Sequence, residues 1–579
     1  MTVDLSKSTV ARYMGPAPER ITVRTGAVVA KDMTHLIGKT VAAEPSIIKV
    51  CEGVHCYVGG SLVIRTIIDA PDGLVIYDTG DDIEDGERAL KAIRSISQRP
   101  IKAVIYSHNH YAHGTKPIIE GQGEVMVIGH PDVNKNFAAL NSGFATGGEF
   151  PEAQPALASR FLLQFGGLLP GEGPDARFLG GIPKISEKGT VMANRLVAFD
   201  GETFNVAGLE MQFFTKHFSD SEDTLSVWIP SLGVALNNFL WPTLPNFYTL
   251  RGDVFRTPYE WMAGVRVLRD LKPTHVISTH ALPVSGQEKV QGTLERYMGA
   301  ISYLIDQTLR GINKGMGPRE LREFVRLPDE LRDEPHNAEI YGEFNYFPPH
   351  IYNHIFGWFD GDAAAIHRLP PAEEARRIVK GFGGAAEVSR QAHAALASDE
   401  VLWALQLVNW LLSADPEVAD AQANRLFKAK ALREMAARAS GTIARHFCLA
   451  QALALEGRIE IPCAVPSTIQ EVLAAEPGRF VNWQRIRLDP AKAGDSRAAL
   501  RIVIDGEDFA LALHHAVAEF REGAAATATK ADAVLSLSKQ AWAEIYTGKT
   551  TLAAALDSGA AKADDRAKVE AFFAMFDPA

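Results

Sequence analysis

Three histidines follow directly on an apolar run that is typical of a β-strand. The run covers residues 102–106, and His108, His110 and His113 come after it at relative positions i, i+2 and i+5. Imidazole suits zinc, iron, nickel and copper, and several imidazoles can bind one side of a metal ion. The simpler interpretation is a polar loop, but the chain has only 17 histidines in 579 residues. The concentration therefore predicts a metal site.

The elements that must position these histidines are short strands alternating with turns and helices, from about residue 45 to 285. Strand-like runs occupy 61–68, 73–80 and 125–129, and residues 83–97 have the apolar spacing of a helix. Because some strands alternate and others are apolar throughout, the pattern indicates an αββα sandwich with helices outside two packed sheets. The stretch 140–190, rich in Gly and Pro, is expected to form long loops over the mouth of the site.

The rest of the chain changes character twice, near residues 370 and 465. The Ala-rich segments 372–381, 385–397, 400–414, 416–437 and 440–457 predict successive helices, which as a group are typical of an interaction domain. Beyond them, residues 498–513 contain two runs with the period of a β-strand, followed by a turn at 549–552 and a closing helix at 564–576. We therefore divide the chain into 1–365, 366–462 and 463–579.

The composition excludes several classes of protein. Apolar residues make up 46% and charged residues 22% of the chain, as in a soluble globular protein, and the net charge of −11 argues against nucleic acid as a partner. The four cysteines indicate reduced thiols rather than a disulfide framework. Charged residues interrupt positions 1–30, and no apolar run approaches the roughly 18 residues of a membrane span. We expect a cytoplasmic protein.

Several dispersed motifs, together with the histidines, resemble the bacterial alkylsulfatases of the metallo-β-lactamase superfamily. The matching segments are 73–79, 103–110, 249–252, 278–280, 356–361 and, in the tail, 548–552. They occur in the expected order within residues 35–579. The resemblance implies an α+β, multi-domain fold: a metallo-β-lactamase sandwich with an N-terminal extension over 1–365, an all-helical dimerisation domain and a sterol-carrier-like α/β domain. It also implies a homodimer formed through the helical domain.

The resemblance further implies a metal centre with two ions, most often zinc. On this sequence the ligand positions of the family are His108, His110, His113, Asp220, Asn238 and His280. The first ion would take two of the histidines of the motif and Asp220, which stands where the family has Glu. The second would take His113 and His280. We expect zinc, as one ion or two, or another divalent transition metal.

Two positions depart from the family pattern. Ala112 stands where the motif has Asp, and a side chain without a donor atom cannot bind a metal. The bridging Glu falls near Asn237 and Asn238, and a one-residue difference in length leaves the choice between them open. His217 and Glu222 are possible substitutes. The alternative is that the four histidines and the carboxylate of Asp220 surround a single ion.

The substrate side is assigned from the same resemblance. Arg251 matches a sulfate-contacting Arg, and a planar guanidinium suits an oxyanion because it donates two parallel hydrogen bonds. Tyr341 matches a substrate-side Tyr. Apolar residues gather in the segments expected to form the walls, which favours a small hydrophobic substrate. These residues are Phe161, Leu162, Leu163, Phe165, Phe239, Leu240, Trp241, Phe247, Tyr248 and Phe347.

Three functions remain open at the level of sequence. The first is a metal-dependent hydrolase of alkyl sulfates, in which a metal lowers the pKa of water to give the nucleophile. The second is hydrolysis of an uncharged hydrophobic ether or carboxylic ester at a rebuilt metal site. The third is a lipid-binding or scaffold protein with a decayed site. The retention of four histidines argues against the third.

Overall fold

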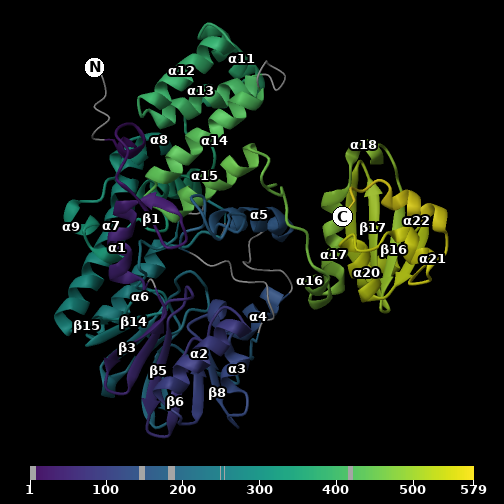
Figure 1. Ribbon diagram of the computed structural model, residues 1–579. Coiled ribbons are helices and arrows are strands. Elements are labelled where there is room, and N and C mark those ends of the chain that lie inside the picture. Colours follow the sequence, from purple (N-terminus) through teal and green to yellow (C-terminus); the bar gives the residue numbers. More distant parts are fainter. Residues whose placement is uncertain are drawn as a thin grey trace. The chain divides into compact units, whose positions relative to one another are not determined.

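The computed structural model describes residues 8–42, 44–141, 150–179, 189–247, 250–252, 254–414 and 421–578. The chain forms two compact units (Figure 1). The first contains Met1–Asn134 and Arg160–Ile461, and the second contains Lys135–Ser159 and Pro462–Ala579. Each unit has its own hydrophobic core.

The first unit is built on two mixed sheets. The seven-stranded sheet has the order β3 (Ser46–Cys51), β4 (Val54–Val58), β5 (Arg65–Ala70), β6 (Gly73–Tyr77), β7 (Ile101–Ile105), β8 (Met126–Gly129) and β9 (Arg195–Leu196). Strands β3 to β6 pair antiparallel, whereas β6 to β9 pair parallel. The α2 helix (Ile83–Ile96) connects β6 to β7. Such a crossover is the usual connection between parallel strands.

The second sheet supplies the other half of the sandwich. Its order is β10 (Glu202–Val206), β11 (Leu209–Phe214), β12 (Ser226–Ile229), β13 (Val234–Asn237), β14 (His275–Ser278) and β15 (Val284–Ser285). One buried cluster combines Ile68 and Ile105 of the first sheet with Phe213, Leu236 and Ile277 of the second, so the sheets pack face to face. Strands β13 and β14 are parallel, with Asn237 beside Ser278. Their carboxyl ends therefore open at the same edge.

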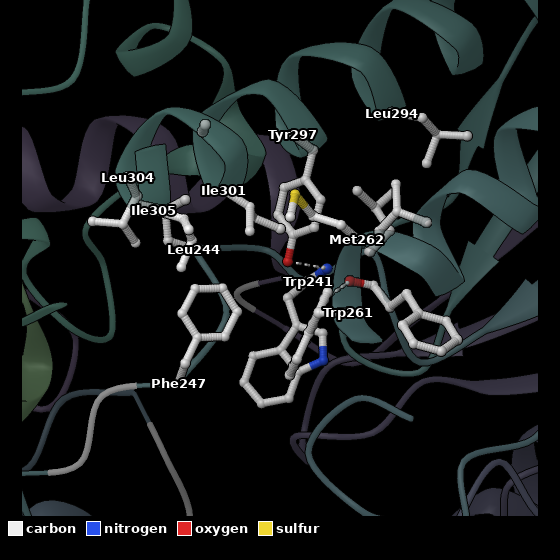
Figure 2. Close-up of a cluster of buried hydrophobic side chains, with 14 of the residues drawn as sticks. Trp241, Leu244, Phe247, Trp261, Met262, Leu294, Tyr297, Ile301, Leu304 and Ile305 are labelled. Atoms are coloured by element: carbon white, nitrogen blue, oxygen red, sulfur yellow. Dashed lines mark hydrogen bonds between the residues drawn. The ribbon is translucent and has the colours of Figure 1, made fainter. Parts of the chain in front are cut away.

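Helices cover the outer face of the second sheet. α6 (Pro258–Asp270), α7 (Gln287–Ile312) and α10 (Phe347–Phe356) share a buried apolar cluster with β13. Figure 2 shows its centre, where Trp241, Trp261 and Tyr297 lie together. Helices therefore lie outside two packed sheets, and the predicted αββα sandwich is confirmed. None of the described helices has the length and apolar content needed to cross a bilayer.

The helical region also belongs to the first unit. Its helices are α11 (Pro371–Gly381), α12 (Ala385–Ala397), α13 (Val401–Ala414), α14 (Ala421–Arg438) and α15 (Thr442–Leu455). All five predicted helices are present, although residues 415–420 lie outside the described part of the chain. They pack through small apolar side chains such as Ala392, Ala404 and Ala452, which are fully buried. Small side chains let helices approach each other closely.

The second unit is a mixed α/β domain. Its sheet has the order β18 (Val517–Glu522), β17 (Glu507–His514), β16 (Ala499–Ile504), β19 (Ala533–Leu537) and β20 (Ala561–Ala563). The residues that alternate in the sequence all lie in its core: Leu500, Ile502, Ile504, Phe509, Leu511 and Leu513. At the predicted turn, the Thr551 hydroxyl accepts a hydrogen bond from the Ala554 amide and caps α21 (Leu552–Asp557). α22 (Arg566–Phe573) closes the domain.

The expectation of long loops over residues 140–190 is wrong for part of that stretch. α4 (Val133–Asn141) extends into it, and α5 (Gln154–Gln164) lies within it. The sequence of α5 is rich in Ala and Leu and has Pro155 in its first turn, where proline is compatible with a helix. Glycine is concentrated after this helix rather than in it. Residues 142–149 and 180–188 lie outside the described part.

Candidate metal centre

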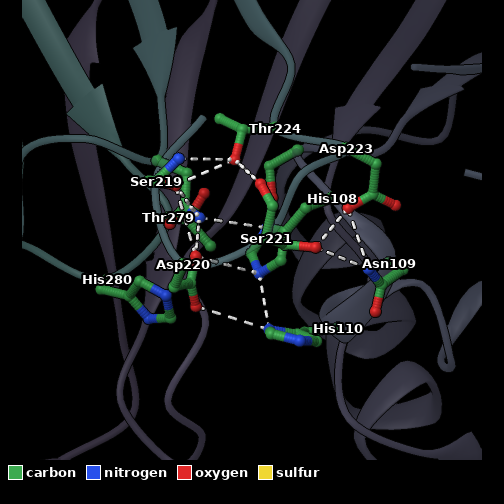
Figure 3. A network of polar contacts seen from close by, with 12 residues as sticks. His108, Asn109, His110, Ser219, Asp220, Ser221, Asp223, Thr224, Thr279 and His280 are labelled. Carbon is green, nitrogen blue, oxygen red and sulfur yellow. Dashed lines mark hydrogen bonds and ion pairs between the residues drawn. The ribbon is translucent and has the colours of Figure 1, made fainter. Parts of the chain in front are cut away.

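His108, Asp220 and His280 converge beyond the ends of the central strands (Figure 3). His108 follows β7, Asp220 lies in the loop between β11 and β12, and His280 follows β14. One ligand atom from each of the three residues lies within 4.8 Å of the other two. The His108 Nε2 atom is 3.9 Å from Asp220 Oδ1. Three loops that are distant in sequence thus bring two imidazoles and a carboxylate to one place.

His110 adds a fourth donor to this group. Its Nδ1 atom is 3.0 Å from His108 Nε2 and 3.4 Å from Asp220 Oδ2. Donors at roughly 2.0–2.1 Å from a tetrahedral ion lie about 3.3 Å apart. The spacing of these donors is therefore that of a metal's ligands.

An unpaired nitrogen of His280 supports the same interpretation. The His280 Nδ1–H donates to the Leu62 carbonyl at 2.9 Å, which fixes the tautomer and leaves Nε2 as the acceptor. That Nε2 atom is buried and has no hydrogen-bond partner among the described residues. A buried polar atom without a partner is costly unless a ligand satisfies it. The residues present fit a bound cation.

The protonation states of the group also suit a metal. Burial lowers the pKa of His108 well below its usual value, and burial lowers the pKa of His280 as well. For Asp220, burial alone would raise the pKa, but His108 and His110 outweigh it and hold the pKa well below the ordinary range. Metal ligands must be neutral imidazoles and ionised carboxylates. These directions favour the metal-binding forms of His108, His280 and Asp220.

The two neighbouring asparagines have different environments. Asn237 ties the strand ends together: its Nδ2 donates to the Ile277 carbonyl, and its Oδ1 accepts from the Phe239 and Leu240 amides. Asn238 faces the centre, where its Nδ2 lies 2.6 Å from Asp220 Oδ1 and 3.3 Å from His108 Nδ1. The structure therefore places Asn238, and not Asn237, against the metal donors.

Other candidates stand apart from this group. His113 is buried, with Nδ1 2.6 Å from Thr190 Oγ1, and it is not part of the donor group that the described residues form. Ala112 is fully buried and forms an isolated bridge with Gly80. His217 forms an ion pair with Glu260 at 2.8 Å, and Glu222 is exposed. The proposed substitutes thus have other environments.

Asp78 has a positioning role that sequence reasoning did not assign. Its carboxylate accepts hydrogen bonds from the Ser107 amide at 2.8 Å and from the Thr279 hydroxyl at 3.1 Å. It therefore joins the residue before His108 to the residue before His280. Its backbone lies in the left-handed region, with φ 60°, which is uncommon for a residue other than glycine. The motif at 73–79 contained this residue, but its partners are distant in sequence.

We expect Asp78 to make the metal-free protein less stable as the pH rises. Burial raises its pKa from 3.8 to about 7, so the folded state holds a proton that the unfolded state has lost. The stability from that proton is present below the unfolded pKa and disappears as the pH rises through about 7. Between pH 6 and 8 the free energy of unfolding should fall by about 1 kcal/mol.

Urea denaturation at both pH values measures this change. The Asp78→Asn variant should lack this fall in the free energy of unfolding between pH 6 and 8. The Asp72→Asn variant, an exposed control in the turn before β6, should retain it. If the free energy of unfolding of Asp78→Asn depended on pH as in the native protein, Asp78 would not be the responsible group.

Cationic and aromatic side chains lie near the centre. The Arg251 guanidinium lies 5.6 Å from the centre of the Phe161 ring. The Tyr341 hydroxyl accepts a hydrogen bond from Gln164 at 2.9 Å. Burial raises the pKa of Tyr341, and the charges of Arg251, Arg256 and Asp220 also act on this group. Two guanidiniums, a phenol and the metal donors are therefore close enough to interact.

Arg256 is the second residue that sequence reasoning missed. It is buried, donates to the Asn246 carbonyl at 3.3 Å, and its charge acts on His108 and Asp220. Its neighbour Phe255 stacks on His354 of α10, with 3.7 Å between ring centres. The loop that carries both arginines thus rests on α10. In the sequence, the feature that could have indicated Arg256 is its position five residues after Arg251.

Aromatic rings surround His280. Trp241 lies 4.7 Å and Tyr111 5.1 Å from it, measured between ring centres. Among the expected wall residues, Phe239, Leu240, Phe247 and Phe347, together with Trp241 itself, belong to the core cluster of the second sheet. Tyr248 lies outside the described residues. Fewer apolar residues are therefore available to line the substrate site than the sequence suggested.

Family models match most of the chain in three segments. Residues 61–113 match the metallo-beta-lactamase superfamily, residues 317–458 match the alkyl sulfatase dimerisation region and residues 467–579 match the alkyl sulfatase C-terminal region.

Individual proteins with similar sequences have related names. A linear primary-alkylsulfatase from a Pseudomonas strain is 32% identical over 481 residues, which are 79% of this chain and 88% of that protein. An (R)-specific secondary-alkylsulfatase from Pseudomonas is 28% identical and covers 88% of this chain and 78% of its own. The structure of the stereoselective inverting sec-alkylsulfatase Pisa1 from Pseudomonas is similar over 100% of this chain and 94% of that one, with a TM-score of 0.73 at 25% identity.

Proposed function

The chain belongs to the alkylsulfatases of the metallo-β-lactamase superfamily, and from this premise we propose that it hydrolyses alkyl sulfates at the centre formed by His108, His110, Asp220 and His280. The observation that carries the proposal is the buried, unpartnered Nε2 of His280, which lies beside His108 and Asp220. It marks a cation site on a fold shared with known sulfatases.

We propose zinc as the metal, held by these three histidines and one carboxylate. Imidazole nitrogens and a carboxylate oxygen are the donors found in catalytic zinc sites. A bound zinc ion would supply Lewis acidity and lower the pKa of water. Asn238 and Ser107 would orient the donors through their contacts with Asp220 and His108.

The sulfate group would be held on the cationic side. Arg251 and Arg256 carry positive charge toward the substrate, and each guanidinium can donate two parallel hydrogen bonds to sulfate oxygens. Because the pKa of Tyr341 is raised, its hydroxyl keeps its proton and can donate it in a hydrogen bond to the anion. Trp241 and Tyr111 would contact the first carbons of the alkyl chain and exclude water from the reacting bond.

Sulfate release from decyl sulfate tests the proposal. We expect release by the zinc-loaded protein, loss of activity after chelation with EDTA, and recovery when zinc is restored. Hydrolysis of decyl acetate or a decyl ether by the same preparation, without sulfate release from decyl sulfate, would contradict it. A metal-loaded protein that acts on none of these compounds would also contradict it and favour a non-catalytic role.

Arg251 offers a test of substrate binding. Arg251→Gln should raise the KM for decyl sulfate by about 10- to 100-fold, since a charged hydrogen bond to an anion is worth about 1.5–3 kcal/mol. The kcat should change less. Steady-state kinetics of sulfate release measure both constants. The matched control is Arg266→Gln, on an exposed position of α6, and it should leave KM unchanged. An unchanged KM in Arg251→Gln would exclude a sulfate contact.

We also propose that the chain is a homodimer. The support is the match of residues 317–458 to the alkyl sulfatase dimerisation region.

A further inference from the structure

We propose that this centre holds one metal ion per chain, in place of the two that the family resemblance implies. The inference rests on the proposed metal-dependent function, but it concerns the number of ions and is measured without activity. It follows from how the donors are grouped and from what has replaced the other ligands.

The donors are grouped around one shared pair, His108 and Asp220. His108 Nε2 lies 3.9 Å from Asp220 Oδ1. This pair of donors is shared by two triangles of potential ligands. His110 completes the first triangle, with 3.0 Å to His108 and 3.4 Å to Asp220. His280 completes the second within 4.8 Å. A histidine that the family assigns to the second ion therefore lies with the ligands of the first.

The remaining positions of a second site offer little to a cation. Ala112 has no donor atom, and His113 is not part of the donor group that the described residues form. Among the described residues, no other group of three potential ligands lies this close together outside the set formed by His108, His110, Asp220 and His280. Asp220 is the only carboxylate in the donor set, whereas a second divalent ion roughly 3.5–4 Å away would need additional negative charge.

Asn238 also disfavours a second metal ion. A carboxylate at this position could bridge two ions, but the amide Nδ2 approaches Asp220 Oδ1 at 2.6 Å and Ser219 Oγ at 3.0 Å. Amide hydrogens carry partial positive charge, so they repel a second cation from this side of Asp220. The same hydrogen bond holds the carboxylate toward the first ion. Ala112 and Asn238 thus remove the second ion together.

Metal counting tests the inference directly. The full-length protein is saturated with zinc, freed of excess metal by gel filtration and analysed by mass spectrometry of the elements. We expect one zinc per chain. Two per chain would overturn the inference even if sulfate is released, and so would none. One zinc per chain without sulfate release would leave the inference intact and count against the proposed function. The two failures are therefore distinguishable.

Variants identify the residues responsible. Ala112→Asp combined with Asn238→Glu should raise the count from one to two, whereas Glu222→Gln, an exposed control, should leave it at one. Since Ala112 is fully buried, the single variant Asn238→Glu with circular dichroism provides a second test if the double variant does not fold. A folded double variant that still binds one ion would refute the role of these positions. Unchanged zinc affinity in His280→Ala, measured by competition with a chelating dye, would refute the shared donor group.

Discussion

Asp220→Asn should lower the rate of sulfate release by at least about 10³-fold. The substitution keeps the size of the side chain but removes the only carboxylate among the metal donors, and it places a second amide against Asn238. A metal ion contributes several kcal/mol to a hydrolysis, and each 1.4 kcal/mol corresponds to about tenfold in rate. Initial rates with decyl sulfate at saturating zinc measure the loss.

The control for this variant is the exposed Glu222→Gln, two residues along the same loop. It should keep full activity, because its side chain points to solvent. Zinc affinity should fall in Asp220→Asn and not in the control. If Asp220→Asn retained activity within tenfold of the native protein, the carboxylate could not be a ligand and the metal centre would be wrongly assigned.

Trp261→Ala should cost about 3–5 kcal/mol of stability, the largest effect we expect in the core. The side chain is completely buried, and its Nε1–H donates to the Phe239 carbonyl at 2.8 Å (Figure 2). It packs edge-on against Trp241 at 5.4 Å and Phe247 at 5.8 Å between ring centres. Since Trp241 in turn packs on His280, the cavity should also weaken zinc binding.

Urea denaturation followed by circular dichroism measures this cost in the metal-free protein. The matched control is Tyr259→Ala, two residues earlier on α6 and 58% exposed, for which a change within about 0.5 kcal/mol is expected. A cost below 1 kcal/mol for Trp261→Ala would mean that the surrounding side chains collapse into the space.

The sequence predicted the parts of the centre that follow from local pattern. An apolar strand followed by His108 and His110 indicated a metal site, and the family resemblance added Asp220 and His280 to it. The choice between Asn237 and Asn238 could not be made in this way, because a shift of one residue at a strand end turns the side chain to the opposite face. Only the three-dimensional contacts with Ile277 and Asp220 distinguish them.

Long-range contacts explain why the roles of other residues could not be predicted from the sequence. The partner of His113 is Thr190, which lies 77 residues later. The role of Asp78 depends on Ser107 and Thr279, and that of Arg256 depends on the loop that brings it toward Asp220. None of these pairs has a periodic signal, so spacing and composition cannot reveal them. The helices and the alternating strands have such a signal, and they were predicted well.

The comparisons favour the first of the three functions that the sequence left open. The relatives with known activity are alkylsulfatases, and similarity extends through the helical and C-terminal regions as well as the sandwich. The altered positions 112 and 238 therefore belong to a member of the alkylsulfatase family. They do not by themselves indicate an ether or ester hydrolase.

The location of the donors beyond the strand ends has an evolutionary consequence. The core of the sandwich is made by residues within the strands, such as Ile105, Leu236 and Ile277, while His108, Asn238 and His280 stand one to three residues past them. A lineage can therefore gain or lose a metal ligand without repacking its interior. The number of ions becomes a trait that a few substitutions at these positions can alter while the scaffold stays constant.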